Sequence, residues 1–214
     1  MLSIFDRNKT FKPRHRKSDT ANARYDLNKL AQEVLSSQLG SDNLRQAVKV
    51  PDGYELSDWI SINVVDLFNQ VNLIYGFMCN GCTEQTCPIM CASPKYEYLW
   101  ADGEKYKTPK KVSAPRYIEL LMDWVDKQLS NESIFPTIPG NKFPDDFKNT
   151  VVKIMRRLFR VYAHIFHAHL DEIVANGAQA HLSTCFRHFI YFVNEFNLLP
   201  ANEAEPLKDV IRYV

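Results

Sequence analysis

The sequence lacks the features of membrane and secreted proteins. No apolar run approaches the ~20 residues that a membrane-spanning helix requires. The first residues, Met1–Asp6, contain too short an apolar stretch for a signal peptide. Net charge is only +1, which argues against a molecule that binds nucleic acid or membranes through overall charge. With 214 residues, of which 45% are apolar, the chain is long enough for one domain with a sizeable core.

The chain also lacks the even number of cysteines that full disulfide pairing requires. Five cysteines, without a secretory signal, do not suit a disulfide scaffold. Free thiols or a bound metal fit this composition better. We therefore expect a protein of the cytoplasm, with the nucleus as a second location.

Positive charge is concentrated at the N-terminus. Residues 1–25 contain few acids and no periodic apolar positions, but seven basic residues: Arg7, Lys9, Lys12, Arg14, Arg16, Lys17 and Arg24. We predict a disordered basic arm over 1–25 and a single helical domain over 26–214. A second basic stretch, residues 105–111, contains four lysines. Both stretches could be docking segments or ordinary solvated surface.

Hydrophobic periodicity predicts a mainly α protein. The expected helices cover 27–35, 41–48, 58–78, 114–129, 146–176, 179–198 and a segment after Pro206. Apolar residues cover most of the circumference of 58–78, so this helix is expected to be central and buried. Alternating aromatics over 96–100, the turn pair Asp102-Gly103 and the segment 105–108 predict one small β-hairpin. The predicted fold is a helical bundle with this hairpin.

Cysteines and histidines gather in two separated stretches that together suit a metal. Cys82 and Cys87 lie in a polar loop, and His164, His167 and His169 follow some eighty residues later. Two thiolates and two imidazoles form a closed tetrahedral zinc site, which would be structural. On an ideal helix His164 and His167 are about 60° apart, whereas His164 and His169 are about 140° apart. Helix geometry alone thus favours His167, and Cys79 and Cys91 leave a site of four thiolates open.

A basic stripe is predicted on the long helix over 146–176. Its members recur at steps of three or four residues: Lys153, Arg156, Arg157 and Arg160. Guanidinium groups suit bidentate binding of phosphate, and apolar neighbours would anchor the helix while the arginines are presented. A plain solvated helix face is the alternative.

Over nearly its whole length the sequence resembles the MOB family of kinase activators. The resemblance rests on ordered segments: Lys9–Pro13, Asn43–Val48, Asp58–Asn72, Cys82–Glu84 with Cys87–Pro88, Pro94–Tyr98 with Trp100–Gly103, Arg156–Ile165, Ala180–Leu182 with His188–Phe189, and Glu195–Leu198. It implies a non-catalytic adaptor and co-activator of NDR/LATS-type Ser/Thr kinases in Hippo-like or mitotic-exit signalling. A monomer is expected.

The resemblance also implies roles for particular residues. The zinc ligands would be Cys82, Cys87, His164 and His169, and this set replaces the preference for His167. Lys153, Arg156, Arg157 and Arg160 would bind the phosphorylated linker of a Hippo-type kinase. The basic regulatory segment of the NDR/LATS-type kinase would contact Glu55, Asp58, Trp59 and Asp66, because opposite charges steer such an encounter. Thr10 resembles a phosphorylation site.

Two other functional classes are considered. A zinc-dependent hydrolase could use Glu84, beside Cys82, as its base. A closed four-ligand site and the absence of a His-Glu-x-x-His motif argue against it. A nucleic-acid-binding zinc protein could use the basic arm and Lys105–Lys111. The near-zero net charge and the lack of standard finger spacing argue against that class.

Overall fold

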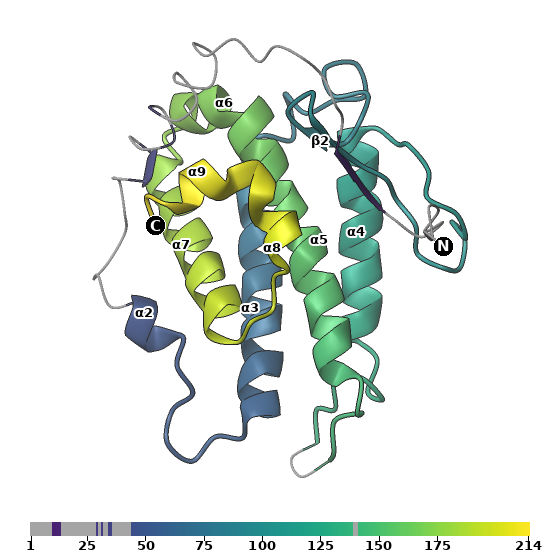
Figure 1. Ribbon diagram of the computed structural model, residues 1–214, viewed down its shortest axis with the longest axis vertical. Coiled ribbons are helices and arrows are strands. Elements are labelled where there is room, and N and C mark those ends of the chain that lie inside the picture. Colours follow the sequence, from purple (N-terminus) through teal and green to yellow (C-terminus); the bar gives the residue numbers. More distant parts are fainter. Residues whose placement is uncertain (1–9, 14–28, 30, 32–33, 36–43, 139–140) are drawn as a thin grey trace, which may run out of the picture.

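A computed structural model of the chain is mainly helical, with one small sheet (Figure 1). It describes residues 10–13, 29, 31, 34–35, 44–138 and 141–214. The described elements follow the order β1 (Phe11–Pro13), α2 (Leu44–Ala47), α3 (Leu56–Gly76), β2 (Cys91–Ala92), β3 (Tyr96–Tyr98), α4 (Ala114–Leu129), α5 (Phe147–Ala168), α6 (Leu170–Ala175), α7 (Gln179–Glu195), α8 (Ala201–Ala204), a 3-10 turn (Glu205–Leu207) and α9 (Lys208–Ile211).

Helix α5 is the centre of the bundle. It packs against α3, α4 and β2, and α3 also packs against α7 (Figure 1). Every residue from Arg157 to Phe166 is buried, so this stretch is enclosed on all sides. The predicted helix 58–78 corresponds to α3, which packs against α4, α5 and α7, in agreement with the expected central position. The expectation that this helix is buried is wrong for one of its sides, where Ile62 and Leu73 are 55% and 54% exposed.

The predicted long helix 146–176 is interrupted. Helix α5 ends at Ala168 and α6 begins at Leu170, with His169 between them at φ −134° and ψ 15°. These angles lie outside the helical region. The interruption turns the His169 side chain away from the position that a continuous helix would give it, and this matters for the metal site described below.

The sheet has three antiparallel strands in the order β1-β3-β2. Phe11 pairs with Tyr98, and Cys91 pairs with Glu97. The predicted hairpin is therefore wrong in its second strand, because residues 105–108 form no strand. Trp100 instead forms an isolated bridge with Lys110. Pro13 lacks a backbone N–H, and its place on an edge strand suits that chemistry.

Strand β1 lies inside the stretch predicted as a disordered arm. Thr10–Pro13 is ordered against β3, and the rest of residues 1–25 lies outside the described residues. The predicted helix over 27–35 also lies mostly outside them. The predicted helix 114–129 is confirmed by α4, and 179–198 is confirmed as α7 with an earlier end at Glu195. Within the described residues, no helix is both long and apolar enough to cross a membrane.

Candidate functional site

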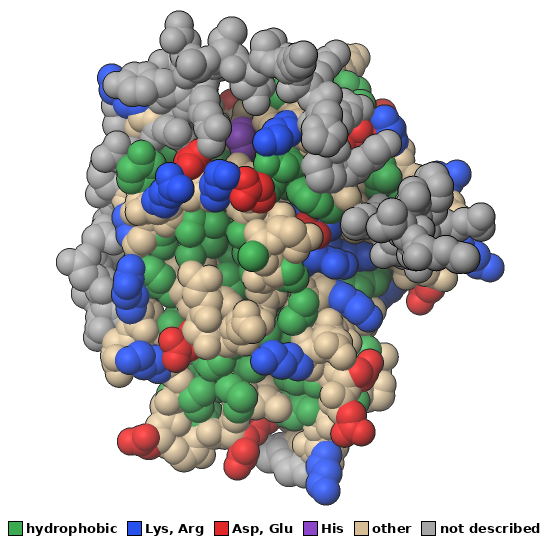
Figure 2. Space-filling view, viewed as in Figure 1, with side chains coloured by type: hydrophobic (Ala, Val, Ile, Leu, Met, Phe, Trp, Pro, Cys, Tyr) green, Lys and Arg blue, Asp and Glu red, His purple; other side chains and the backbone are tan. Residues whose placement is uncertain are grey.

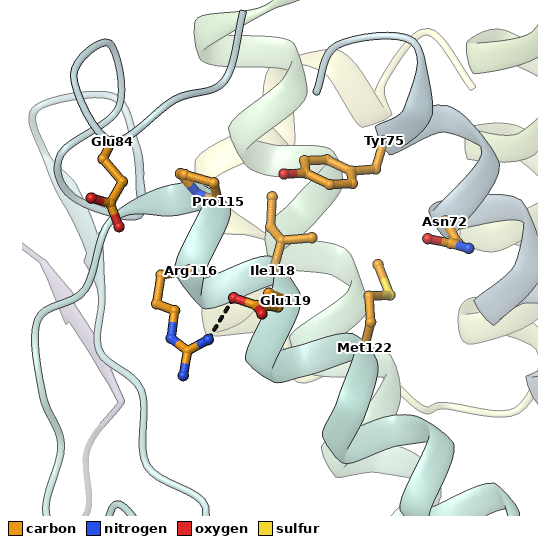
Figure 3. Close-up of a pocket in the computed structure, with 8 residues that line it drawn as sticks. All are labelled: Asn72, Tyr75, Glu84, Pro115, Arg116, Ile118, Glu119 and Met122. Carbon is orange, nitrogen blue, oxygen red and sulfur yellow. Dashed lines mark hydrogen bonds and ion pairs between the residues drawn. The ribbon is translucent and has the colours of Figure 1, made fainter. Parts of the chain in front are cut away.

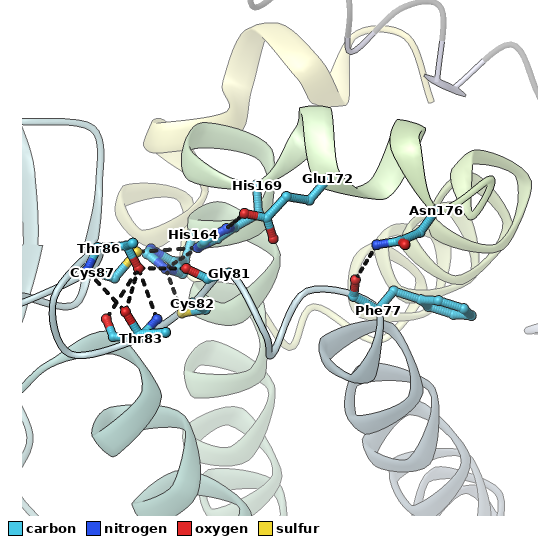
Figure 4. A network of polar contacts seen from close by, with 10 residues as sticks. All are labelled: Phe77, Gly81, Cys82, Thr83, Thr86, Cys87, His164, His169, Glu172 and Asn176. Carbon is cyan, nitrogen blue, oxygen red and sulfur yellow. Dashed lines mark hydrogen bonds and ion pairs between the residues drawn. The ribbon is translucent and has the colours of Figure 1, made fainter.

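Four buried side chains from two distant stretches converge at one end of α5. Cys82 and Cys87 come from the loop after α3, His164 from α5 and His169 from the α5–α6 break (Figure 4). The donor atoms lie within 4.8 Å of one another. Cys82 Sγ is 3.5 Å from His164 Nε2, Cys87 Sγ is 3.3 Å from His169 Nε2, and the two Nε2 atoms are 3.2 Å apart. This cluster could hold a metal ion.

The outer nitrogen of each imidazole also faces a protein oxygen. His164 Nδ1 lies 2.8 Å from the Cys91 carbonyl oxygen. His169 Nδ1 lies 3.3 Å from Glu172 Oε1 in an ion-pair contact that lacks hydrogen-bond geometry, and this nitrogen has no hydrogen bond in the described structure. An oxygen at Nδ1 fixes the ring so that Nε2 points inward, which is the usual outer shell of a metal-binding histidine. Backbone holds His164, whereas a carboxylate that is 39% exposed holds His169.

The cysteine loop is held by its own hydrogen bonds. The Thr83 backbone N–H donates to Thr86 Oγ1 at 2.9 Å, and the Cys87 N–H donates to the Thr83 carbonyl at 2.8 Å. Thr86 Oγ1 in turn donates to the Gly81 carbonyl at 2.5 Å. These bonds fold the loop into a compact turn, so both sulfurs point to the histidines (Figure 4).

Helix α6 closes over this loop at two places. Asn176 Nδ2 donates to the Phe77 carbonyl at 2.8 Å. The Glu172 carboxylate lies directly on Gly81, where an added Cβ would come within 2.0 Å of Oε1. Only a residue without a side chain leaves this space, so Gly81 permits the approach of Glu172 to His169 (Figure 4).

Cys79, Cys91 and His167 supply no donor side chain to the cluster, although the Cys91 carbonyl contacts His164. His167 Nε2 lies 3.1 Å from the Pro206 carbonyl oxygen, on the side of the C-terminal helices. Cys79 is exposed. The α5–α6 break explains why helix geometry favoured His167 over His169: the ideal-helix angle does not apply across His169.

Burial governs protonation in the cluster. It lowers the pKa of His164 to about 4, so this imidazole is neutral near pH 7 and its Nε2 can donate an electron pair. Burial, and then the neighbouring Cys87, raise the pKa of the Cys82 thiol above its ordinary value. A bound cation would instead lower the pKa of the Cys82 thiol, because it favours the thiolate form.

Only part of the predicted basic stripe is exposed at the protein surface. Lys153 is exposed and Arg156 is 32% exposed, but Arg157 and Arg160 are only 9% and 1% exposed. The expectation that all the arginines are presented to solvent is therefore wrong. In Figure 2, Lys and Arg side chains lie on the surface beside α5 and α8.

Arg160 is the centre of a buried polar network. Its Nη2 donates to Glu203 Oε1 at 2.8 Å, and its Nη1 donates to Tyr117 Oη and to Thr10 Oγ1, both at 3.1 Å. Burial opposes the charge, but Tyr117 and then Glu203 outweigh burial and raise the pKa of Arg160. Thr10, the predicted phosphorylation site, is thus buried and bonded, so a kinase would reach it only after β1 separates from the sheet.

Arg157 lies between two aromatic rings. Its guanidinium carbon is 4.2 Å from the ring centre of Trp124 and 4.7 Å from that of Trp100. Its Nη2 donates to the Ala101 carbonyl at 2.5 Å. Burial lowers the pKa of Arg157 to about 10, which leaves it charged near pH 7. In the described part of the chain, Glu203 is the one carboxylate that forms ion pairs with the arginines of the stripe. The region therefore carries excess positive charge.

One side of α3 combines acids with exposed apolar side chains. Asp58 and Asp66 are exposed, as are Ile62, Val65 and Leu73. Their spacing places them on neighbouring turns of the same side. We call these five residues the α3 face. A mixed apolar and acidic surface of this kind is typical of an interaction site.

The other residues predicted to contact a kinase lie at the start of α3. Glu55 is exposed and immediately precedes the helix. Trp59 is half-buried, and its Nε1 donates to the Val48 carbonyl at 2.9 Å, which ties α2 to α3. Asp66 accepts a hydrogen bond of 2.7 Å from Gln70, and His188 Nδ1 lies 3.8 Å from the same oxygen. These contacts hold the Asp66 carboxylate in place.

These features define a helical domain with a buried four-donor cluster that joins two distant segments, and with charged surfaces beside it. The model of the Mob1/phocein family matches residues 36–207. The chain is 49% identical to MOB kinase activator 3A of Homo sapiens over 210 residues, which cover 98% of this chain and 95% of the relative. It is 50% identical to MOB kinase activator-like 1 homolog B of Dictyostelium discoideum over 213 residues, 99% and 96% of the two chains. The chain belongs to the Mob1/phocein family.

Proposed function

We propose that this protein is a non-catalytic, zinc-binding adaptor that co-activates an NDR/LATS-type Ser/Thr kinase and also binds phosphorylated segments of a Hippo-type kinase. The family and the names of its relatives support regulation of a kinase. The α3 face carries the proposal, because it is exposed and combines the charge and the apolar area that a basic regulatory segment would require.

Zinc suits the metal cluster by donor type and by spacing. Tetrahedral zinc, with bonds of about 2.3 Å to sulfur and about 2.0 Å to nitrogen, would separate sulfur from nitrogen by about 3.5 Å and the two nitrogens by about 3.3 Å. The structure has 3.5 Å for Cys82–His164, 3.3 Å for Cys87–His169 and 3.2 Å for the two nitrogens, with all four donor atoms within 4.8 Å of one another. Two thiolates and two neutral imidazoles are a common zinc set. Bound zinc would cross-link the cysteine loop to the end of α5 and the α5–α6 break.

The same donor set argues for a structural role. Four protein donors occupy all four tetrahedral positions, so none is left for a water or a substrate. Glu84, considered as a base, is an exposed loop residue. An adaptor needs only a correctly folded binding surface. A metal site with no open coordination position is consistent with that role.

The α3 face could supply substantial binding free energy. Burying a whole Val, Leu or Ile side chain gives roughly 1.5–3 kcal/mol. Ile62, Val65 and Leu73 have about half of their surface left to bury, so together they could give roughly 3 kcal/mol. Asp58 and Asp66 would steer a basic segment to this face and fix its register. Because Gln70 already holds the Asp66 carboxylate, little side-chain entropy remains to be lost on binding.

Charge reversal on α3 tests the kinase-docking part of the proposal. Asp66→Lys should abolish binding of an NDR/LATS-type regulatory segment, measured by fluorescence anisotropy, while zinc content and melting temperature stay nearly unchanged. Asp145→Lys, which reverses an exposed acid before α5, is the control and should bind normally. Equal binding by the Asp66→Lys and original proteins would refute the assignment.

Excess positive charge supports the phosphopeptide part of the proposal. Arg156 and Lys153 reach the surface, and Arg157 lies behind them with one buried Nη1 that has no hydrogen-bond partner in the described structure. A phosphate with its acceptor oxygens would balance this charge. We infer that Lys153 and Arg156 meet the phosphate first, whereas Arg157 and Arg160 contribute from the interior.

A further inference from the structure

A concave surface lies between α3, α4 and the cysteine loop (Figure 3). Its volume is about 460 Å³, within the range of pockets that hold small organic groups. The floor is apolar and consists of Pro115, Ile118, Met122 and the ring of Tyr75. Asn72, Arg116 and the two acids Glu84 and Glu119 complete the lining. We call this surface the α3–α4 groove.

The rim of the groove is acidic. Glu84 stands on the loop at one end, and Glu119 stands on α4 (Figure 3). Asp123 and Asp126 follow Glu119 at steps of four and three residues, so the three exposed acids share one side of α4. Arg116 pairs with Glu119 at 2.5 Å. The lining itself has two acids, Glu84 and Glu119, against Arg116, and Glu84 forms no ion pair within the described residues. Asp123 and Asp126 lie beyond the lining and add negative charge along α4.

The groove borders the α3 face but extends to another side of α3. Asn72, which lines the groove, follows Val65 of the α3 face by seven positions, so the two are only about 20° apart around an ideal helix. Tyr75, also in the groove, follows Asp66 by nine positions, which places those two about 180° apart. A ligand in the groove therefore contacts mainly the side of α3 that faces α4.

We infer that the α3–α4 groove binds a short basic segment of a partner protein. The segment places one or two apolar side chains on the partly exposed Pro115, Met122 and Tyr75, and its Lys or Arg side chains meet the rim acids. Charge complementarity selects this occupant, because an acidic or purely apolar segment would leave the rim carboxylates unpaired or desolvated. The inference stands apart from kinase docking on the α3 face and does not depend on it.

A defined probe tests the inference. The probe is the fluorescein-labelled, amidated heptapeptide Lys-Leu-Lys-Lys-Leu-Leu-Lys, and its control replaces each lysine by glutamate. Binding to the full chain is followed by fluorescence anisotropy at low salt. The basic probe should bind, and the acidic control should bind at least tenfold more weakly. Equal binding of the two peptides would overturn the inference.

Three double variants with the same change in net charge locate the site. The groove pair is Glu84→Lys with Glu119→Lys, the α3-face pair is Asp58→Lys with Asp66→Lys, and the remote pair is Glu104→Lys with Asp145→Lys. The groove pair should weaken the probe about tenfold, and the other two pairs less than twofold. An equal loss in all three pairs would mean attraction by net charge, and a loss confined to the α3-face pair would mean binding there. Either result overturns the inference.

Two further measurements guard against misfolding and self-association. Met122→Ala removes part of the apolar floor without changing charge, and should weaken the probe several-fold while circular dichroism stays unchanged. If the probe binds Met122→Ala unaltered, the floor takes no part and the inference fails. If the original chain sediments as a dimer that the groove pair converts to a monomer, a second copy is the occupant and the inference is again overturned.

Discussion

The contact between Gly81 and Glu172 predicts a specific loss of metal affinity. Adding a methyl group in Gly81→Ala would place a Cβ 2.0 Å from Glu172 Oε1. Because Glu172 is a flexible side chain that is 39% exposed, its carboxylate can swing into solvent and the fold can survive. Gly81 does not have a positive φ, so alanine fits the backbone there. The displaced carboxylate would leave His169 Nδ1 buried without a partner.

The expected magnitude follows from the role of Glu172. Loss of an outer-shell partner typically costs about 10–100-fold in metal affinity, which is about 1.4–2.7 kcal/mol. Gly81→Ala should therefore weaken zinc binding by about this factor, and Glu172→Ala should do the same. The double variant should lose no more than either single one, because Glu172→Ala already removes the group that collides with the new methyl.

Competition with a chromophoric zinc chelator measures all three affinities. Gly76→Ala is the matched control, since an added Cβ there meets nothing within 4 Å, and its affinity should be unchanged. Additive losses in the double variant would refute the reasoning, because they would show that Gly81 and Glu172 act on the metal independently. An unchanged affinity in Glu172→Ala would refute it as well.

Three further predictions concern the same domain. His167→Ala should keep one zinc per chain by atomic absorption, because His167 faces Pro206 and not the cluster; loss of zinc would contradict the ligand set. Arg156→Ala should weaken a phosphothreonine peptide about tenfold in calorimetry and leave the unphosphorylated peptide unchanged, since charge-assisted bonds are each worth roughly 1.5–3 kcal/mol; equal losses for both peptides would exclude phosphate binding there. Burial lowers the pKa of His188 below its ordinary 6.5, with Asp66 opposing, so the neutral form is favoured on folding. The free energy of unfolding should therefore carry no penalty from His188 above pH 6.5 and should decrease as the pH falls below that value. The melting temperature of His188→Gln should lack this pH-dependent decrease.

The helices were largely predictable because their periodicity is local. Helix α4 begins and ends where the pattern of 114–129 placed it, and α7 differs mainly at its C-terminal end. The sheet was not predictable in the same way. Strand β3 pairs with β1, which lies more than eighty residues earlier in a stretch without an apolar period. Pairing over such a distance depends on tertiary packing that no short window of sequence contains.

The sites show the same division between local and distant information. The spacing of the four stripe residues indicated one side of α5 but could not show that Arg157 and Arg160 face inward. Trp124, Tyr117 and Glu203, which accommodate them, come from other elements. Glu172 was missed altogether. Its position three residues after His169 was the available signal, because side chains three positions apart are neighbours on one side of a helix.

The cysteine–histidine cluster has a consequence for how the domain responds to its surroundings. The Cys82–His164 and Cys87–His169 pairs each join residues 82 positions apart, so a bound metal closes a long loop of chain. In a loop-entropy treatment, a cross-link of that span removes roughly 4–5 kcal/mol of freedom from the unfolded chain, as a disulfide would. A disulfide depends on an oxidising compartment, whereas chelation does not. Zinc bound there, as proposed above, would make the folded population rise with the supply of free zinc, by mass action.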